Sequence, residues 1–179
     1  MTYPDLLKTE VTEPLQLKDT VVKLSPEQEK RFAQGHGAQH QKAHAWALDA
    51  LAGAGAIRST ANDMLTYLEA QVHPDTVPHG TGSAATLTSA LQMSHELRAD
   101  AFPTMKIALA WLYEMNTGSY WHNGATGGYS SYALFNPKED YAAVVLFNTT
   151  INANGSFADR LGEHVVERLA GKPAISLNQ

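Results

Sequence analysis

The 179-residue sequence contains no cysteine, so disulfide bonds, thiolate catalysis and cysteine-based zinc sites are excluded within this chain. It also has no apolar run near the roughly 20 residues that a membrane-spanning helix requires. The longest such run, Tyr141 to Phe147, has the length of a strand. The first residues, Met1 to Asp5, lack the basic and then apolar pattern of a secretory signal. We therefore expect no membrane span and no export signal in this chain.

Basic residues are few, with 13 Lys and Arg against 18 Asp and Glu, and the formal net charge is −5. No basic run resembles a polybasic membrane anchor, and this charge balance argues against nucleic acid as a partner. Hydrophobic residues make up 44% of the chain and charged residues 17%, which are the proportions of a globular protein. At this length we expect a single domain with its own core.

Motifs that carry a nucleophilic serine are absent as well. No serine is followed three positions later by lysine, and neither Tyr-x-Asn nor Gly-x-Ser-x-Gly occurs. The one Ser-x-Asn, Ser176-Leu177-Asn178, stands in the C-terminal tail, which is a poor place for catalysis. The chain therefore carries no recognisable nucleophile of its own.

Helices are predicted where capping residues precede an apolar repeat. They run from Thr2 to before Pro14, from Ser25 to about Ala33, from Ser59-Thr60 to His73, from Ser83 to about His95, and from Ser156 to Gly171. The stretches Gly35 to Trp46 and Asp75 to Gly82 are predicted to be loops, and Leu51 to Gly55 a tight turn or a close backbone contact.

The pattern changes to strands after Pro103. Apolar residues alternate from Met105 to Met115, which predicts one strand. Three more strands are predicted at Ser119 to Asn123, Tyr129 to Phe135 and Tyr141 to Asn148, and their short connections favour an antiparallel meander. The fold class is therefore α+β, with a mostly helical and loop part at residues 1–100 and a sheet plus a final helix at residues 101–179.

The stretch Trp121 to Tyr132, W-H-N-G-A-T-G-G-Y-S-S-Y, carries the most chemistry. The chain resembles class C β-lactamases and the related D-alanyl-D-alanine carboxypeptidases and esterases over four segments: Leu17 to Gln28, Ala52 to Met64, His122 to Pro137 and Ala143 to Thr149. In these serine hydrolases a Lys/His, small polar, Gly triplet on a strand forms one wall of the active site, and His122-Asn123-Gly124 is similar to that triplet. The resemblance implies the C-terminal portion of a β-lactamase/transpeptidase-like fold: an antiparallel sheet with flanking helices, without the N-terminal strands and the nucleophile helix.

The resemblance also implies roles for individual residues. His122 and the backbone N–H of Ala125 would be catalytic, the latter as one of two oxyanion-hole donors, while Asn123, Gly124 and Thr126 would bind substrate. The substrate would be a β-lactam, a D-Ala peptide or an ester, and no cofactor is needed. The missing motifs place the start of this chain just after Tyr-x-Asn, so we expect it to be inactive alone and to need its N-terminal half or to self-associate. A periplasmic or secreted location is common in the family.

Other interpretations stay open from the sequence. His122 could be an ordinary strand histidine, and Gly127 and Gly128 a plain hairpin turn. The chain could be a non-catalytic binding or association module derived from the same fold. His36, His40 and His44 are spaced four apart and would share one helix face suited to zinc or nickel. Gly35 and Gly37 disfavour a helix there, so an incidental loop is the preferred reading.

Overall fold

The fold is centred on a six-stranded antiparallel sheet in the order β3-β4-β5-β6-β7-β8. The computed structural model describes residues 1–77, 83–151 and 155–178. The strands are β3 (Ala99–Phe102), β4 (Met105–Ile107), β5 (Leu112–Glu114), β6 (Ser119–Thr126), β7 (Tyr129–Asn136) and β8 (Tyr141–Phe147). The predicted α+β class and the antiparallel meander are confirmed.

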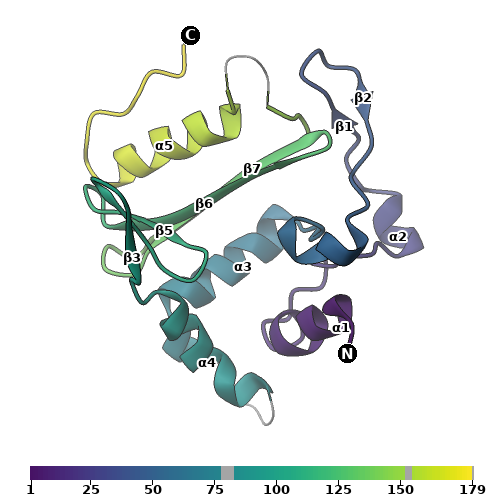
Figure 1. The fold of residues 1–179 in the computed structure, drawn as a ribbon, viewed down its shortest axis with the longest axis horizontal. Helices are drawn as coiled ribbons and strands as arrows, with labels where there is room; N and C mark the ends of the chain where they lie inside the picture. The colour runs from purple at the N-terminus through teal and green to yellow at the C-terminus, as the bar shows by residue number, and fades with distance from the viewer. Residues whose placement is uncertain (78–82, 152–154, 179) are drawn as a thin grey trace.

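Helices cover both faces of this sheet, as Figure 1 shows, with α5 on one side and α3 on the other. The helices are α1 (Tyr3–Leu7), which continues as a π-helical turn over Lys8–Thr12, α2 (Pro26–Glu29), α3 (Ala61–Val72), α4 (Ser83–Ser94) and α5 (Phe157–Leu169), with short 3-10 helices at Asp49–Ala54 and Pro74–Thr76. In the described part of the chain no helix is long and apolar enough to cross a membrane.

The predicted caps are confirmed. The side chains of Thr60 and Ser156 accept hydrogen bonds from the backbone N–H groups of Asp63 and Asp159, which begin α3 and α5. Ser25 and Gln28 form a reciprocal capping box at α2. These bonds satisfy N–H groups that have no partner inside the helix, and each cap stabilises its helix by about 1 kcal/mol.

The core has three parts that follow the layers. Between α3 and the sheet lie Leu68, Val72, Ala108, Trp111 and Phe135. Between α5 and the sheet lie Tyr132, Leu134, Ala158 and Val166. The third part joins α3 and α4 to the N-terminal segment, and it contains Leu15, Leu17, Ala70, Val77, Leu87 and Leu91.

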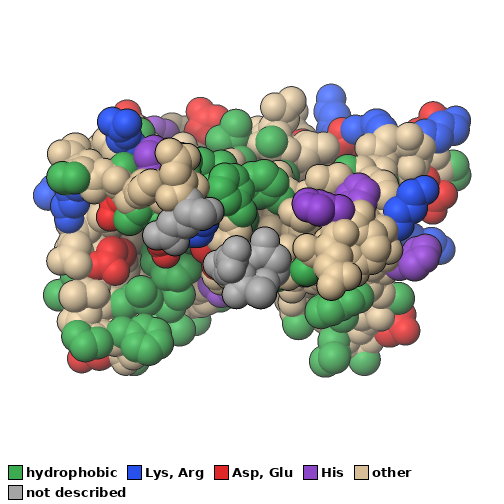
Figure 2. Space-filling view, turned by 90° about the horizontal axis from the view of Figure 1, so that it is seen from above, with side chains coloured by type: hydrophobic (Ala, Val, Ile, Leu, Met, Phe, Trp, Pro, Cys, Tyr) green, Lys and Arg blue, Asp and Glu red, His purple; other side chains and the backbone are tan. Residues whose placement is uncertain are grey.

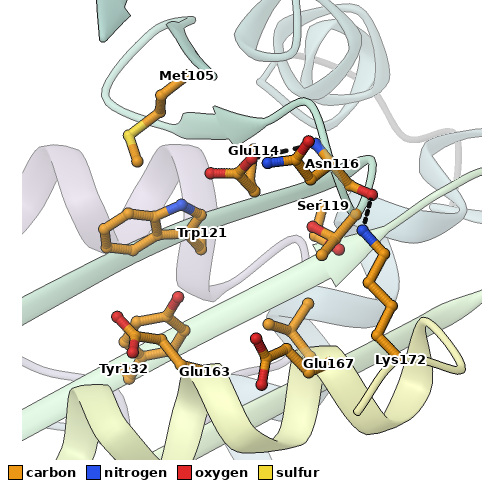
Figure 3. A pocket seen from close by; sticks show the side chains of 11 residues that line it. Met105, Glu114, Asn116, Ser119, Trp121, Tyr132, Glu163, Glu167 and Lys172 are labelled. Atoms are coloured by element: carbon orange, nitrogen blue, oxygen red, sulfur yellow. Dashed lines mark hydrogen bonds between the residues drawn. The ribbon is translucent and has the colours of Figure 1, made fainter. Parts of the chain in front are cut away.

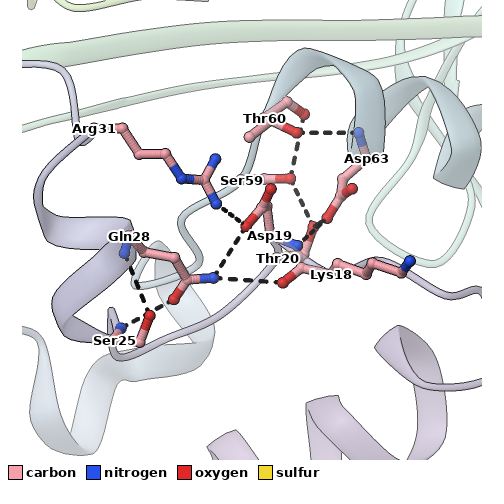
Figure 4. Close-up of polar contacts among 9 residues, drawn as sticks. All are labelled: Lys18, Asp19, Thr20, Ser25, Gln28, Arg31, Ser59, Thr60 and Asp63. Carbon is pink, nitrogen blue, oxygen red and sulfur yellow. Dashed lines mark hydrogen bonds and ion pairs between the residues drawn. The ribbon is translucent and has the colours of Figure 1, made fainter.

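A network of hydrogen bonds connects the N-terminal segment to the start of α3 (Figure 4). The Asp63 carboxylate accepts from the backbone N–H of Asp19 at 2.7 Å and from the Thr20 hydroxyl at 2.8 Å. Hydrogen bonds from Arg31 and then Gln28 hold the pKa of Asp19 below its usual range. Nearby, the Arg58 guanidinium donates to the carbonyl oxygen of Val22.

The chain differs from the sequence predictions in several places, among them the helix predicted from Ser25 to about Ala33, which ends at Glu29. The stretch Met105 to Met115 forms two strands, because the chain reverses between them with Ala110 at φ 63° and a hydrogen bond from the Ala108 N–H to the Trp111 carbonyl. Gly35 to Trp46 contains a small hairpin, in which β1 (Gly35–His36) pairs with β2 (Lys42–Ala43). Strand β3 was not predicted at all. Of the predicted loop that follows the Pro74–Thr76 helix, residues 78–82 lie outside the described residues.

Candidate active-site wall on strand β6

Strand β6 has one edge that is only partly paired. It pairs with β7 from Tyr120 to Thr126, but it pairs with β5 only from Ser119 to Trp121. Across the described residues, the edge of β6 from His122 to Thr126 therefore faces no other strand. An open edge of this kind can add an extended ligand by backbone hydrogen bonds.

The two faces of β6 carry different groups. Trp121 stacks on Tyr132 at 5.2 Å in the layer beneath α5, and the amide of Asn123 donates to the Asp159 carboxylate of α5 at 2.9 Å. Because side chains alternate along a strand, His122, Gly124 and Thr126 face the opposite side. His122 is exposed there, and its Nδ1 lies 2.6 Å from the carbonyl oxygen of Asn123.

The structure thus brings the predicted site residues together on one strand, but not on one face. His122, Gly124 and Thr126 share the face away from α5. The side chain of Asn123 is held on the α5 side by Asp159, which lies 36 positions further along the chain. Sequence reasoning missed this contact, because no local pattern links the two residues.

Ala125 presents its backbone to the open edge. Gly127 and Gly128 form a two-residue loop closed by the pair Thr126–Tyr129, with Gly128 at φ 82°. Such a turn is ordinarily closed by a hydrogen bond between those two residues. Because bonded and outward-pointing residues alternate in an antiparallel ladder, the N–H of Ala125 points away from β7. Gly124 is confined on its side-chain face, where a Cβ would lie 3.3 Å from the Ser131 hydroxyl.

The tip of the β6–β7 hairpin meets the first half of the chain. A Cβ on Gly127 would lie 2.5 Å from both the Trp46 ring and the carbonyl oxygen of His44, so this position has no room for a side chain. The Gly55 backbone approaches the Thr126 methyl closely, because a Cβ there would lie 3.4 Å from it. The stretch Leu51 to Gly55, expected to be a tight turn or a close backbone contact, forms the end of the Asp49–Ala54 3-10 helix, and Gly55 lies in ordinary contact with Thr126 at the end of the open β6 edge.

Two large apolar side chains in this half of the chain are exposed to solvent. Trp46 is 56% exposed and Leu51 is 66% exposed. Apolar groups next to an open strand edge are typical of a surface that another segment or a ligand covers.

The three histidines of the 36–44 segment do not form a metal site. His36 and His40 lie in a hairpin instead of a helix, and His36 bonds through its backbone to Gly128 and Asn148. Figure 2 shows histidines exposed over the end of the molecule that carries this hairpin. Within residues 1–77, 83–151 and 155–178, no group of three or more His, Asp or Glu could hold a metal ion.

Comparison with known proteins shows the family of the chain. The sequence matches the family model described as Beta-lactamase over residues 1–167, which is most of the chain. The chain belongs to the beta-lactamase family. It is also 24% identical over 187 aligned positions to the D-alanyl-D-alanine-carboxypeptidase/endopeptidase AmpH of Escherichia coli K12, and equally to that of Escherichia coli O157:H7. These alignments cover 97% of this chain but 46% of each relative, so the chain spans less than half the length of the relatives it matches.

Proposed function

We propose that residues 1–179 form a single partial domain, the C-terminal part of a serine hydrolase that acts through an acyl-serine intermediate. The observation that carries the proposal is the open edge of β6, where His122, Gly124 and the outward N–H of Ala125 lie within one short stretch of strand. The nucleophile and its base would come from a segment bearing Ser-x-x-Lys and Tyr-x-Asn, neither of which occurs in this sequence.

Each wall residue has a defined task in this proposal. A substrate would lie along β6, and Gly124, without a side chain, lets its backbone come close. The N–H of Ala125 would donate to the oxyanion of the tetrahedral intermediate, with the second donor at the serine. His122 would bind a substrate carboxylate or polarise the tyrosine base. Thr126 would contact substrate at the end of the edge, and Asn123 would do so after releasing Asp159.

The relatives support a choice of substrate class. The name of the AmpH proteins describes a carboxypeptidase and endopeptidase of D-alanyl-D-alanine. We therefore favour D-Ala peptides, with β-lactams and simple esters as alternatives that use the same acyl chemistry. This chemistry requires no cofactor, because the serine, its base and the oxyanion donors carry every step.

The chain alone is expected to be inert. Purified protein of 19.4 kDa should neither hydrolyse nitrocefin or p-nitrophenyl acetate nor gain mass from a bound acyl group. Hydrolysis rates and intact mass after incubation check this. A stable acyl adduct on this chain would show that one of its own serines is the nucleophile, and the proposal would be wrong.

The free edge of β8 favours association with another segment. Strand β8 reads Tyr-Ala-Ala-Val-Val-Leu-Phe, carries no charge, and ends the sheet in the described structure. The opposite edge strand, β3, is shorter and bears Asp100 paired with Lys106, a charged arrangement that discourages pairing. In the intact protein we propose that the N-terminal half pairs with β8, and that copies of the chain pair there when that half is missing.

Light scattering after size exclusion tests this association. The wild-type chain is expected to elute as a dimer or larger species, and Leu146→Lys as a monomer, because a lysine on an edge strand opposes pairing. Leu146 is 43% exposed, so the folded state should tolerate the change. Leu6→Lys on α1, where the leucine is 46% exposed, is the matched control and should behave as wild type. A monomeric wild-type chain would contradict the proposal.

A further inference from the structure

A cavity lies on the face of the sheet that carries α5, away from the face of His122 (Figure 3). Its volume is about 410 Å³, which is within the range of small-molecule sites. Strands β4 to β7 and the end of α5 contribute to it. The residues that line it include Glu114, Thr117, Trp121, Tyr132, Glu163 and Glu167.

The floor of the cavity is aromatic. The rings of Trp121 and Tyr132 stack nearly in parallel, at 5.2 Å and an interplanar angle of 6°. Gly162 of α5 lies directly over the Tyr132 ring, because a Cβ there would come within 2.3 Å of it. The tyrosine is therefore fixed between the helix and the indole. The face of an indole attracts cations through its quadrupole.

Carboxylates form the opposite wall, and one of them is free. Glu114 accepts from the backbone N–H of Asn116 at 3.1 Å, and Glu167 accepts from that of Ile175 at 2.6 Å. The one lysine at the cavity, Lys172, donates to the Asn116 carbonyl. Among the described residues Glu163 has no hydrogen-bond or ion-pair partner. Partial burial, followed by the charges of Asp159 and Glu167, raises the pKa of Glu163.

Two hydroxyl groups at the cavity also lack partners in the described structure. Tyr132 is only 3% exposed, yet its hydroxyl makes no hydrogen bond. Burial raises the pKa of Tyr132, and the carboxylates of Glu163, Asp159 and Glu114 raise it further. Tyr132 lines the cavity together with Glu163 and Glu114. The Thr117 hydroxyl oxygen, by contrast, is itself buried and has no partner in the described structure. A buried polar atom without a partner is uncommon and is typically satisfied by a ligand or a water.

We propose that this cavity binds a small organic cation, an alkylammonium compound such as a diamine. The ammonium group would lie between Glu163 and the face of Trp121, and the hydroxyls of Tyr132 and Thr117 would accept hydrogen bonds from it. The carboxylates outnumber the lysine there, so an anion is excluded. The site is separate from the β6 edge, because Trp121 and His122 lie on opposite faces of the sheet. The proposal therefore does not depend on hydrolase activity.

Titration calorimetry of the full chain with 1,5-diaminopentane, at pH 7.5 and low salt, tests the proposal. Saturable binding is expected, weakened about tenfold or more by Glu163→Gln, because a hydrogen bond to a charged group contributes roughly that factor. Glu69→Gln removes the same charge from an exposed position on α3 and should bind as wild type. The uncharged 1,5-pentanediol should not bind.

Tyr132→Phe is a second variant that keeps the ring stack and removes only the hydroxyl, and it should weaken binding severalfold. Neither variant should unfold the chain. The raised pKa of Glu163 means that its ionised form disfavours the folded state above that pKa, so at pH 7.5 Glu163→Gln leaves the melting temperature equal or higher. No saturable binding to the wild type, equal binding by Glu163→Gln, or equal binding of the diol would each overturn the proposal.

Discussion

Replacing Phe135 with alanine is expected to lower the free energy of unfolding by about 3–5 kcal/mol, the usual cost of removing a buried phenylalanine. Phe135 is fully buried near the end of β7. Its ring packs against Trp111 at 4.9 Å, Tyr120 at 5.1 Å and His95 at 5.0 Å. The substitution therefore leaves a cavity where α3 packs on the sheet. Since total stability is commonly about 5–15 kcal/mol, much of the folded population would be lost on mild heating.

Urea denaturation monitored by circular dichroism measures this change. The matched control is Phe102→Ala, because Phe102 on β3 is 66% exposed and its loss should change stability by about 0.5 kcal/mol or less. If the two variants unfold at similar urea concentrations, the packing of β7 against α3 described above is wrong.

The same region contains a buried polar side chain whose hydrogen bonds are made by neighbouring side chains. The Gln71 side chain is 1% exposed, and it bonds to the Tyr67 hydroxyl at 2.8 Å and to His95 Nε2 at 2.6 Å. Partial burial lowers the pKa of His95, so the neutral imidazole donates to Gln71. Removing Phe135 would admit water to this network and add to the loss of stability.

Local patterns predicted the helices and the central strands well. The capping residues Thr60 and Ser156 begin α3 and α5 as expected, and β7 and β8 occupy the predicted apolar stretches. These elements are long and half-buried, so their periodicity reports which face meets the core.

Elements without a buried face could not be predicted in this way. All four residues of β3 are exposed, so no alternation marks that strand. The reversal near Ala110 carries neither glycine nor proline, and the apolar alternation continues through it because Trp111 turns into the core. A turn formed by tertiary packing leaves no local signal.

The candidate sites also divide into one that the sequence indicated and one that it did not. The wall from His122 to Thr126 is contiguous, and the resemblance of this segment to the family's strand motif indicated it. The cavity beside Trp121 was missed, because its residues come from several separate elements. The only local sign was the spacing of Glu163 and Glu167, which places both carboxylates on one face of α5.

His122→Ala is expected to lower kcat/KM by about 10²-fold or more once a Ser-x-x-Lys segment completes the enzyme, because preorganised electrostatic groups contribute effects of that size. His122 is exposed, so its loss should leave stability nearly unchanged and isolate the catalytic role. Steady-state kinetics with a D-Ala peptide or p-nitrophenyl acetate measure the effect.

His122→Lys supplies the matched control, since the family motif accepts either residue. It should retain most activity. Equal activity of wild type and His122→Ala would assign His122 to an ordinary strand position.

The most direct test of the account is complementation. The chain is co-expressed with an N-terminal half that carries Ser-x-x-Lys and Tyr-x-Asn, from the DNA preceding its own Met1 codon or from another member of the family. Hydrolysis and intact mass are then measured on the purified pair. We predict turnover, a covalent acyl group on the N-terminal segment only, and none on the 179-residue chain. A pair that forms without any acylation or turnover would contradict the account, and would leave the chain as a non-catalytic association module.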